Sequence, residues 1–168
     1  MENKPAQRKE VLQMISGGAS NRELVKAFVK LTPEKVIGGN FPSMAKLKKE
    51  AGEKKLSEAL AILLIDASLS FGDPMNKEQA LDLSTEILTY YYYLSLEECM
   101  LVLNRLKRTK VFKFTINVVL TAFDNYDHER LKIIDDNNYS NHLSIKETRT
   151  AGKSTQSIIN LIKASHQK

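Results

Sequence analysis

The chain has 168 residues, of which 42% are hydrophobic and 27% are charged, values that predict one soluble globular domain with a single core. The longest uncharged apolar run, residues 59–65, is too short to cross a bilayer, and the charged N-terminus lacks the apolar stretch of a secretory signal. The single cysteine, Cys99, excludes an internal disulfide framework and a cysteine zinc cluster, so we expect a cytoplasmic protein without membrane contact.

The first 52 residues predict short helices, because glycine and proline interrupt them repeatedly. The interrupting residues are Gly17, Gly18, Pro33, Gly38, Gly39 and Pro42. Ser20 and Glu23 have the spacing of a capping box, which predicts a helix start. Ser43 is placed to cap a short basic helix that ends near Gly52.

Two longer helices follow. Residues 54–69 are apolar on nearly every side, which is typical of a helix at the centre of a core. Gly72 and Pro74 end this helix. Asn76 begins the next one, with Gln79 as its capping partner, and this helix runs into four consecutive tyrosines at 90–93.

Ser95 and Glu98 form another capping box, and the helix that they open ends in a basic cluster. Cys99 lies on its apolar side, so we expect a buried, inert thiol. Residues 111–114 alternate as a strand or an extended link, and Thr115 opens a long helical pattern. A polar loop over 135–141 and an amphipathic tail helix over 155–164 are expected after it.

These elements predict an all-α fold: a compact bundle of six to eight helices with a short tail helix. Residues 1–52 should form a short-helix segment packed on the core, 53–135 the helical core, and 136–168 the polar loop and tail, in one domain overall.

The charge pattern is uneven. Residues 61–100 carry seven acidic residues and one basic residue, whereas residues 101–115 carry five basic residues and no acid. The five cations, predicted to contact nucleic acid or an acidic partner, are Arg105, Lys107, Arg108, Lys110 and Lys113. Tyr90 and Tyr93 are the candidates for stacking on bases. In the alternative interpretation, the rings belong to the core and the cations form a solvated rim.

Other motifs are weaker. Asp136, Asn138, Ser140 and Glu147 nearly match a twelve-residue calcium loop, although a polar surface loop explains them as well. Residues 151–155 resemble the end of a phosphate loop without its first glycine, so a flexible linker before the last helix is expected there. His128 follows Asp124 by four residues, which favours a solvated helix surface over a metal site. We therefore expect no cofactor, no resident metal and no enzymatic activity.

One pattern carries a family resemblance. It consists of Met75, Gln79, Ile87, residues 91–96, Leu103, Arg105, Phe123, Tyr126 and Arg130. Residues 75–132 thereby resemble small, largely uncharacterised α-helical proteins of phages, prophages and mobile elements of Bacteroidetes, in which "MT-x-x-Q", "YY-x-LS" and "L-x-x-Y-x-x-x-R" follow one another. The glycines of that family's basic loop are missing here, although its charge is kept.

The resemblance implies a phage or mobile-element setting beside replication genes, hence a bacterial or phage-infected cell. Tyr126 and Arg130 lie on one helix face, where we expect them to pair with the acidic residues of 61–100, the acidic block, and hold the helices together. The leading hypothesis is a non-enzymatic helper that binds DNA, RNA or a replication protein through the basic helix end. The alternative is a protein–protein interaction module, such as a virion component or a host-factor inhibitor, that binds no nucleic acid.

Overall fold

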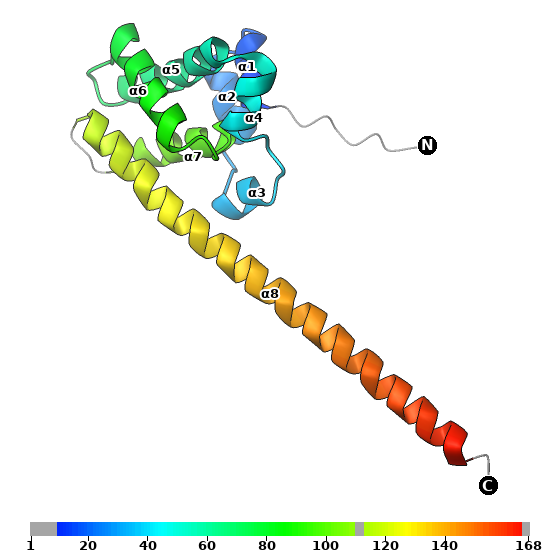
Figure 1. The fold of residues 1–168 in the computed structure, drawn as a ribbon. Helices are drawn as coiled ribbons and strands as arrows, with labels where there is room; N and C mark the ends of the chain where they lie inside the picture. Colours follow the sequence, from blue (N-terminus) through cyan, green and yellow to red (C-terminus); the bar gives the residue numbers. More distant parts are fainter. Residues whose placement is uncertain (1–9, 110–112, 166–168) are drawn as a thin grey trace. The chain divides into compact units, whose positions relative to one another are not determined.

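The computed structural model describes residues 10–109 and 113–165, and within these ranges it contains helices, turns and links but no strand. The helices, drawn in Figure 1, are α1 (Val11–Ser16), α2 (Asn21–Phe28), α3 (Pro33–Ile37), α4 (Met44–Ala51), α5 (Glu53–Leu69), α6 (Lys77–Tyr90), α7 (Leu96–Leu106) and α8 (Ile116–Ser165). The predicted all-α class is confirmed. One unit ends at Arg130, and a second unit from residue 131 onward holds the rest of α8.

Local side-chain caps set the helix starts, as the sequence predicted. The Glu23 carboxylate accepts hydrogen bonds from the backbone N–H of Ser20 at 2.8 Å and from its hydroxyl at 2.9 Å. Ser43 Oγ accepts the backbone N–H of Lys46 at 3.3 Å and so caps α4. Each contact satisfies groups that a helix terminus leaves without partners. The starts of α2 and α4 therefore lie where the spacing of Ser20 and Ser43 predicts them.

The core is broader than the expected segment from residue 53 onward. The helices of the first 52 residues contribute buried apolar side chains of their own: Val11, Leu12, Leu24, Phe28, Val36, Met44 and Leu47. At the other end, the last buried apolar residue among those described is Tyr126, and Leu131 is 51% exposed. Nine of the eleven residues of α7 are buried, so α7 shares the centre of the fold with α5.

The run of tyrosines is a turn as well as a helix end. The helix α6 ends at Tyr90, and the carbonyls of the following turn bind the start of α4. Met44 N–H donates to Leu94 O at 2.7 Å, and Ala45 N–H donates to Tyr92 O at 2.8 Å. These bonds satisfy two otherwise unpaired N–H groups of α4 and fix the turn in place.

A buried carboxylate joins α7 to α8. Glu98 Oε1 accepts the Tyr126 hydroxyl at 3.0 Å and Arg130 Nε at 2.8 Å, while Oε2 accepts the Ser95 N–H at 2.7 Å. The expected pairing of Tyr126 and Arg130 with the acidic block is thus confirmed. Nearby, the Tyr91 hydroxyl donates to Asp124 Oδ1 at 2.5 Å. Glu98, one of the seven acidic residues of 61–100, is therefore internal structure and not part of a solvated face.

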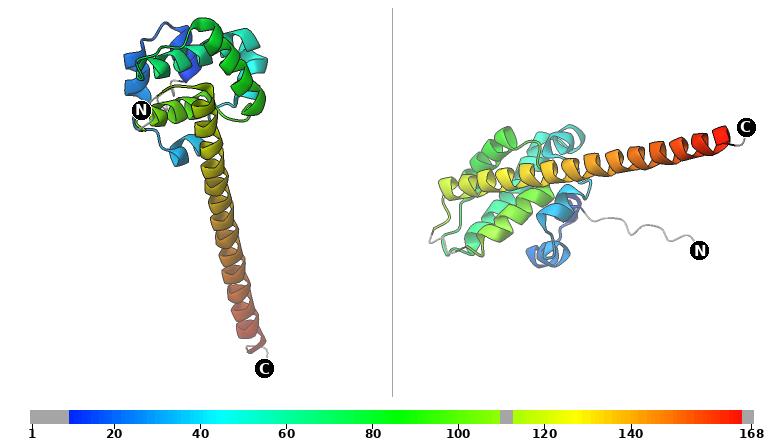
Figure 2. Two further views of the ribbon diagram at one scale, coloured as in Figure 1. Left: turned by 90° about the vertical axis from the view of Figure 1, so that its left-hand side faces the viewer. Right: turned by 90° about the horizontal axis from the view of Figure 1, so that it is seen from below.

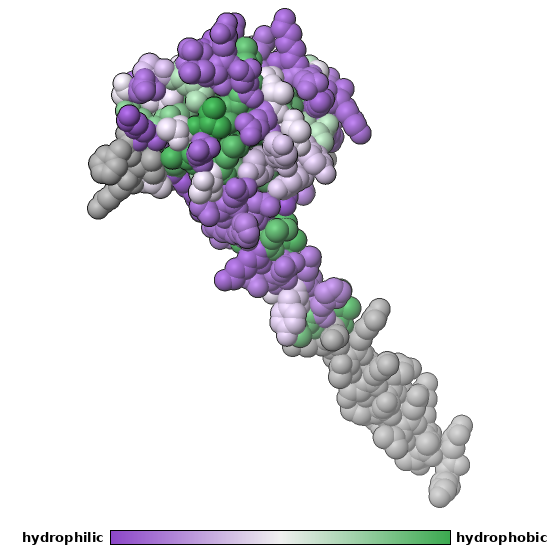
Figure 3. All heavy atoms as spheres, turned by 60° about the vertical axis from the view of Figure 1, so that its left-hand side comes forward, coloured by the Kyte–Doolittle hydropathy of each residue, from purple (hydrophilic) through white to green (hydrophobic). Residues whose placement is uncertain are grey.

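The predicted polar loop over 135–141 is wrong, because α8 runs through it without a break (Figure 2). The Ser140 hydroxyl donates to the Asp136 carbonyl at 2.9 Å, a contact between successive helical turns. Side chains 135–143 are exposed, and hydrophilic side chains dominate this part of α8 in Figure 3. A fully solvated helix needs no apolar stripe, so its sequence looks like a loop. The predicted tail helix over 155–164 is the last part of α8 and not a separate element.

Two buried groups on α7 complete the core. Glu97 is 1% exposed, and its Oε1 accepts the Val11 N–H at 2.9 Å, which caps α1 where no local side chain does so. Burial raises the pKa of Glu97, and the bond from Val11 opposes that rise. Cys99 is fully buried as predicted, with Sγ 3.7 Å from Met44 Sδ, and burial raises the pKa of its thiol.

Candidate functional site at the basic end of α7

The predicted cations do not form one free patch. Arg105 forms a two-pronged ion pair with Glu129 of α8, at 2.5 and 3.4 Å, and Lys107 forms an ion pair with Asp66 of α5. Arg108 and Lys113 are exposed, and within the described residues neither has an acidic partner at ion-pair distance. Lys110 lies outside the described residues. Much of the basic segment therefore neutralises acids from other helices.

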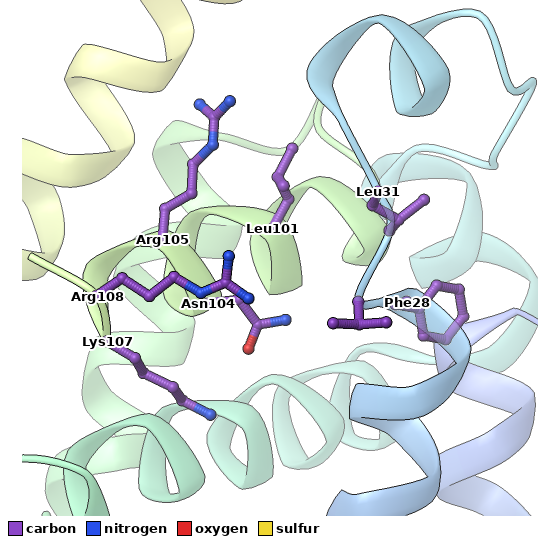
Figure 4. A pocket seen from close by; sticks show the side chains of 8 residues that line it. Phe28, Leu31, Leu101, Asn104, Arg105, Lys107 and Arg108 are labelled. Carbon is purple, nitrogen blue, oxygen red and sulfur yellow. The ribbon is translucent and has the colours of Figure 1, made fainter.

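A stripe on one face of α7 points to a different grouping of these residues. Leu101, Asn104, Arg105 and Arg108 follow one another at i, i+3, i+4 and i+7, so they share a face that continues just past the helix end. Lys107 lies on another face and points toward α5 (Figure 4). The helical spacing of the sequence could have identified Leu101 and Asn104 as part of this site, whereas the prediction from charge alone did not include them.

This face borders a cavity of about 240 Å³. Its walls combine apolar groups with the polar end of α7: Phe28, Val29, Leu31, Leu101, Asn104, Arg105, Lys107 and Arg108. In Figure 4, Arg108 and Asn104 extend from α7 toward Phe28. Asn104 is half-buried, and among the described residues its amide has no hydrogen-bond partner. We call this space the α7 cavity.

Local turns hold both sides of the α7 cavity. On one side, Thr109 N–H and its hydroxyl both bind the Leu106 carbonyl, at 3.0 and 2.7 Å, which keeps Arg108 beside the helix end. On the other side, Leu31 N–H donates to the Phe28 carbonyl at 3.1 Å in the turn after α2. Buried Phe28 anchors that turn to the core, so both walls are parts of one packed unit.

Glu34 adds a negative group near this site. Its pKa is lowered, first by a hydrogen bond from Thr32 and also by the positive charge of Arg105. The side chain is exposed and lines a neighbouring cavity of about 500 Å³. The cationic character of the α7 cavity therefore depends chiefly on Arg108, because Arg105 and Lys107 already face carboxylates.

The tyrosines are arranged differently from the predicted stacking pair. Tyr90 and Tyr92 are 66% and 55% exposed, whereas Tyr93 is half-buried. The Arg130 guanidinium lies 5.5 Å from the centre of the Tyr93 ring, and Tyr92 meets that ring edge-on. Burial and a hydrogen bond to Asp127 raise the pKa of Tyr93 to about 12. The Tyr93 ring is thus engaged within the fold.

The residues that nearly match a calcium loop do not form a loop, because the first three of them lie on α8. Asp136, Asn138 and Ser140 are each two positions apart, and on a helix such neighbours point in nearly opposite directions. His128 is exposed on α8, with Nδ1 2.7 Å from the Asp124 carbonyl, as expected of a surface histidine. In the part of the chain that the structure describes, no three His, Cys, Asp or Glu side chains are grouped to hold a metal ion.

Comparison with family models, with curated proteins and with solved structures returns no match to this chain. The resemblance to phage and mobile-element proteins therefore stays a prediction. No helix among the described residues is long and apolar enough to span a membrane.

Proposed function

We propose that the protein is a non-enzymatic binding module that captures an acidic protein partner at the α7 cavity. One observation carries the proposal: Arg108, a cation without an ion-pair partner among the described residues, borders a cavity with an apolar side made by Phe28, Val29, Leu31 and Leu101. Charge draws an acidic partner to such a surface, and an apolar side chain gains free energy by entering the cavity.

The size of the cavity favours a partner protein over a small cofactor. Pockets for small-molecule ligands have volumes of about 300–1,000 Å³. The α7 cavity, at about 240 Å³, lies below that range and suits a side chain of a partner, whereas the neighbouring cavity of about 500 Å³ lies within it. This interpretation follows the hypothesis of a helper that binds through its basic helix end. The resemblance of residues 75–132 makes a phage or mobile-element replication protein our preferred partner.

Nucleic acid is a weaker candidate at the same surface. Phosphate binding needs several cations that are free to replace counterions, and Arg105 and Lys107 are already paired with acids. Stacking on bases needs exposed rings, and Phe28 is buried at 7% exposure. Both points favour a protein partner at this site.

Fluorescence anisotropy tests the proposal across a salt series. The probes are a short labelled peptide of aspartate, glutamate, leucine and serine, and labelled single- and double-stranded DNA. We expect the peptide to bind and Arg108→Gln to weaken its affinity about tenfold or more, because a hydrogen bond to a charged group contributes about 1.5–3 kcal/mol. Lys113→Gln is the matched control, since Lys113 is an exposed cation of the same segment that does not line the cavity.

Two results would overturn the proposal. Equal losses in both variants would mean that the peptide senses general positive charge and not this site. DNA binding that weakens steeply with salt, without peptide binding, would make the protein a nucleic-acid binder.

A further inference from the structure

The α7 cavity does not stand alone, and its neighbour indicates what kind of segment it receives. We infer that the site takes a short peptide segment with two apolar side chains and a carboxylate beside the first of them. This inference rests on the proposed function and specifies the chemistry of the partner. The first apolar side chain occupies the α7 cavity, and the second occupies the neighbouring cavity beside α3.

The polar groups of the α7 cavity match a peptide. A primary amide offers both a donor and an acceptor, so the amide of Asn104, which binds no other described residue, can bind the C=O and N–H of a peptide backbone. Arg108 presents a planar fork of donors that fits a carboxylate with two parallel bonds. Asn104 on α7 and Arg108 in the turn just after it are four residues apart and line the same cavity, so the two groups bind neighbouring parts of one ligand.

The second cavity, of about 500 Å³, shares two of its walls with the first. Phe28 and Leu31 line both, so the two spaces lie on either side of the same pair of apolar side chains. The remaining lining of the second cavity is Ala27, Glu34, Lys35, Gly38 and Phe41. A single segment that crosses Phe28 and Leu31 can therefore place one apolar side chain in each cavity.

The charges give the bound segment a direction. Glu34 and Lys35 together leave the second cavity without net charge. At the α7 cavity, Arg105 and Lys107 are neutralised by acids, and Arg108 supplies one further positive charge. An acidic residue is stabilised next to Arg108 and gains nothing beside Glu34. The carboxylate therefore belongs with the side chain in the α7 cavity.

The same anisotropy assay, with the full chain, separates this inference from the proposed function. Four labelled peptides of equal length are compared: an acidic peptide with two leucines, one with a single leucine, one with serine at both positions, and the two-leucine peptide with asparagine and glutamine in place of its acids. We expect the affinity to fall about tenfold, or about 1.4 kcal/mol, for each lost leucine, because each loss leaves one cavity without an apolar side chain. Loss of the acids should weaken binding at least as much.

Two variants at exposed positions, one for each cavity, test the inference without disturbing the core. Val29 is 48% exposed in the wall of the α7 cavity, so Val29→Glu should abolish binding of the two-leucine peptide. Ile62→Glu is its matched control, since Ile62 is a similarly exposed apolar residue that lines neither cavity. Ala27→Trp places a large ring in the wall of the second cavity and narrows it, which should reduce the two-leucine peptide to the affinity of the single-leucine peptide.

The outcomes are distinct. If the acidic serine peptide binds as well as the two-leucine peptide, the apolar anchors are wrong, whereas acidic-partner binding stands. If none of the acidic peptides binds, both the proposed function and this inference fail. If Ala27→Trp leaves both leucine peptides unchanged while Val29→Glu abolishes binding, the site takes one apolar side chain and not two.

Discussion

The Tyr126 hydroxyl donates to Glu98 Oε1 at 3.0 Å, and the same oxygen accepts Arg130 Nε at 2.8 Å. One carboxylate of α7 thereby holds one turn of α8 at two points. The Glu98 side chain is only 6% exposed, so each of these bonds forms away from bulk water. Hydrogen bonds to buried charges are strong, and the loss of one partner leaves the other group buried and unpaired. This contact should therefore be important for the stability of the fold.

Removing Glu98 should destabilise the protein strongly. We expect Glu98→Ala to lower the free energy of unfolding by about 3–5 kcal/mol, because Arg130 is left partly buried without its counter-charge. Tyr126→Phe, which deletes one hydrogen bond, should cost about 1–3 kcal/mol. Urea unfolding of both single variants and the double variant measures the coupling, which should be about 0.5–3 kcal/mol. Purely additive costs would show that the two side chains stabilise the fold independently.

Glu97 should make the stability depend on pH. Burial raises its folded pKa above the ordinary value of 4.5, so the folded state binds this proton more tightly than the unfolded state. Its contribution is complete below about pH 4.5 and is lost as pH rises through the folded pKa. Glu10 and Glu98, the charged neighbours, push the pKa in the same direction.

Glu97→Gln isolates this effect, because it keeps an acceptor for the Val11 N–H but cannot ionise. Urea titrations at several pH values measure the free energy of unfolding of the wild type and of the variant. The wild-type value minus the variant value should decrease as the pH rises above 4.5. A difference that stays constant with pH would mean that Glu97 has the same pKa in both states.

Gly39 should not tolerate a side chain. A Cβ there would lie 2.7 Å from the Lys35 carbonyl oxygen and 2.7 Å from the Phe41 ring. We expect Gly39→Ala to cost about 1–3 kcal/mol, as overpacking does elsewhere, and to shift Phe41 at the second cavity. Thermal unfolding measures the cost. Gly38→Ala, where the nearest atom would lie at 3.1 Å, is the neighbouring comparison and should cost less.

The second unit should be dispensable for folding. The buried apolar residues among those described lie between Val11 and Tyr126, so a chain that stops after Lys132 keeps them all. Its melting temperature should change by less than about 4 °C, the shift that 1 kcal/mol produces in a domain of this size. Far-ultraviolet circular dichroism checks this result. A broad, uncooperative transition would show that residues 133–168 support the core.

Contacts within a few residues could be predicted from the sequence. The caps at Ser20, Ser43 and Ser95 depend on partners three residues away, and all lie where the spacing placed them. The pairing of Tyr126 and Arg130 with an acid was also predictable, since two polar groups on one helix face near an acidic block need a partner. The identity of that partner, Glu98, required the packing of α8 on α7.

Contacts between distant helices could not be predicted. The pairing of Arg105 with Glu129 and of Lys107 with Asp66 depends on how α8 and α5 lie against α7. A cluster of charges in the sequence therefore looked free when much of it was paired. The loop prediction over 135–141 is wrong for a different reason. A helix that is exposed on all sides lacks the apolar periodicity by which a packed helix is recognised in a sequence.

The buried thiol of Cys99 allows the rate of local opening around α7 to be measured. A maleimide reacts with thiolate only, and Cys99 is fully enclosed with a raised pKa, so each labelling event requires the chain to open around α7. Because Cys99 is the single cysteine, the mass of one adduct reports that opening without any engineered label. Labelling rates with and without a bound peptide would then show how much binding at the α7 cavity slows this opening.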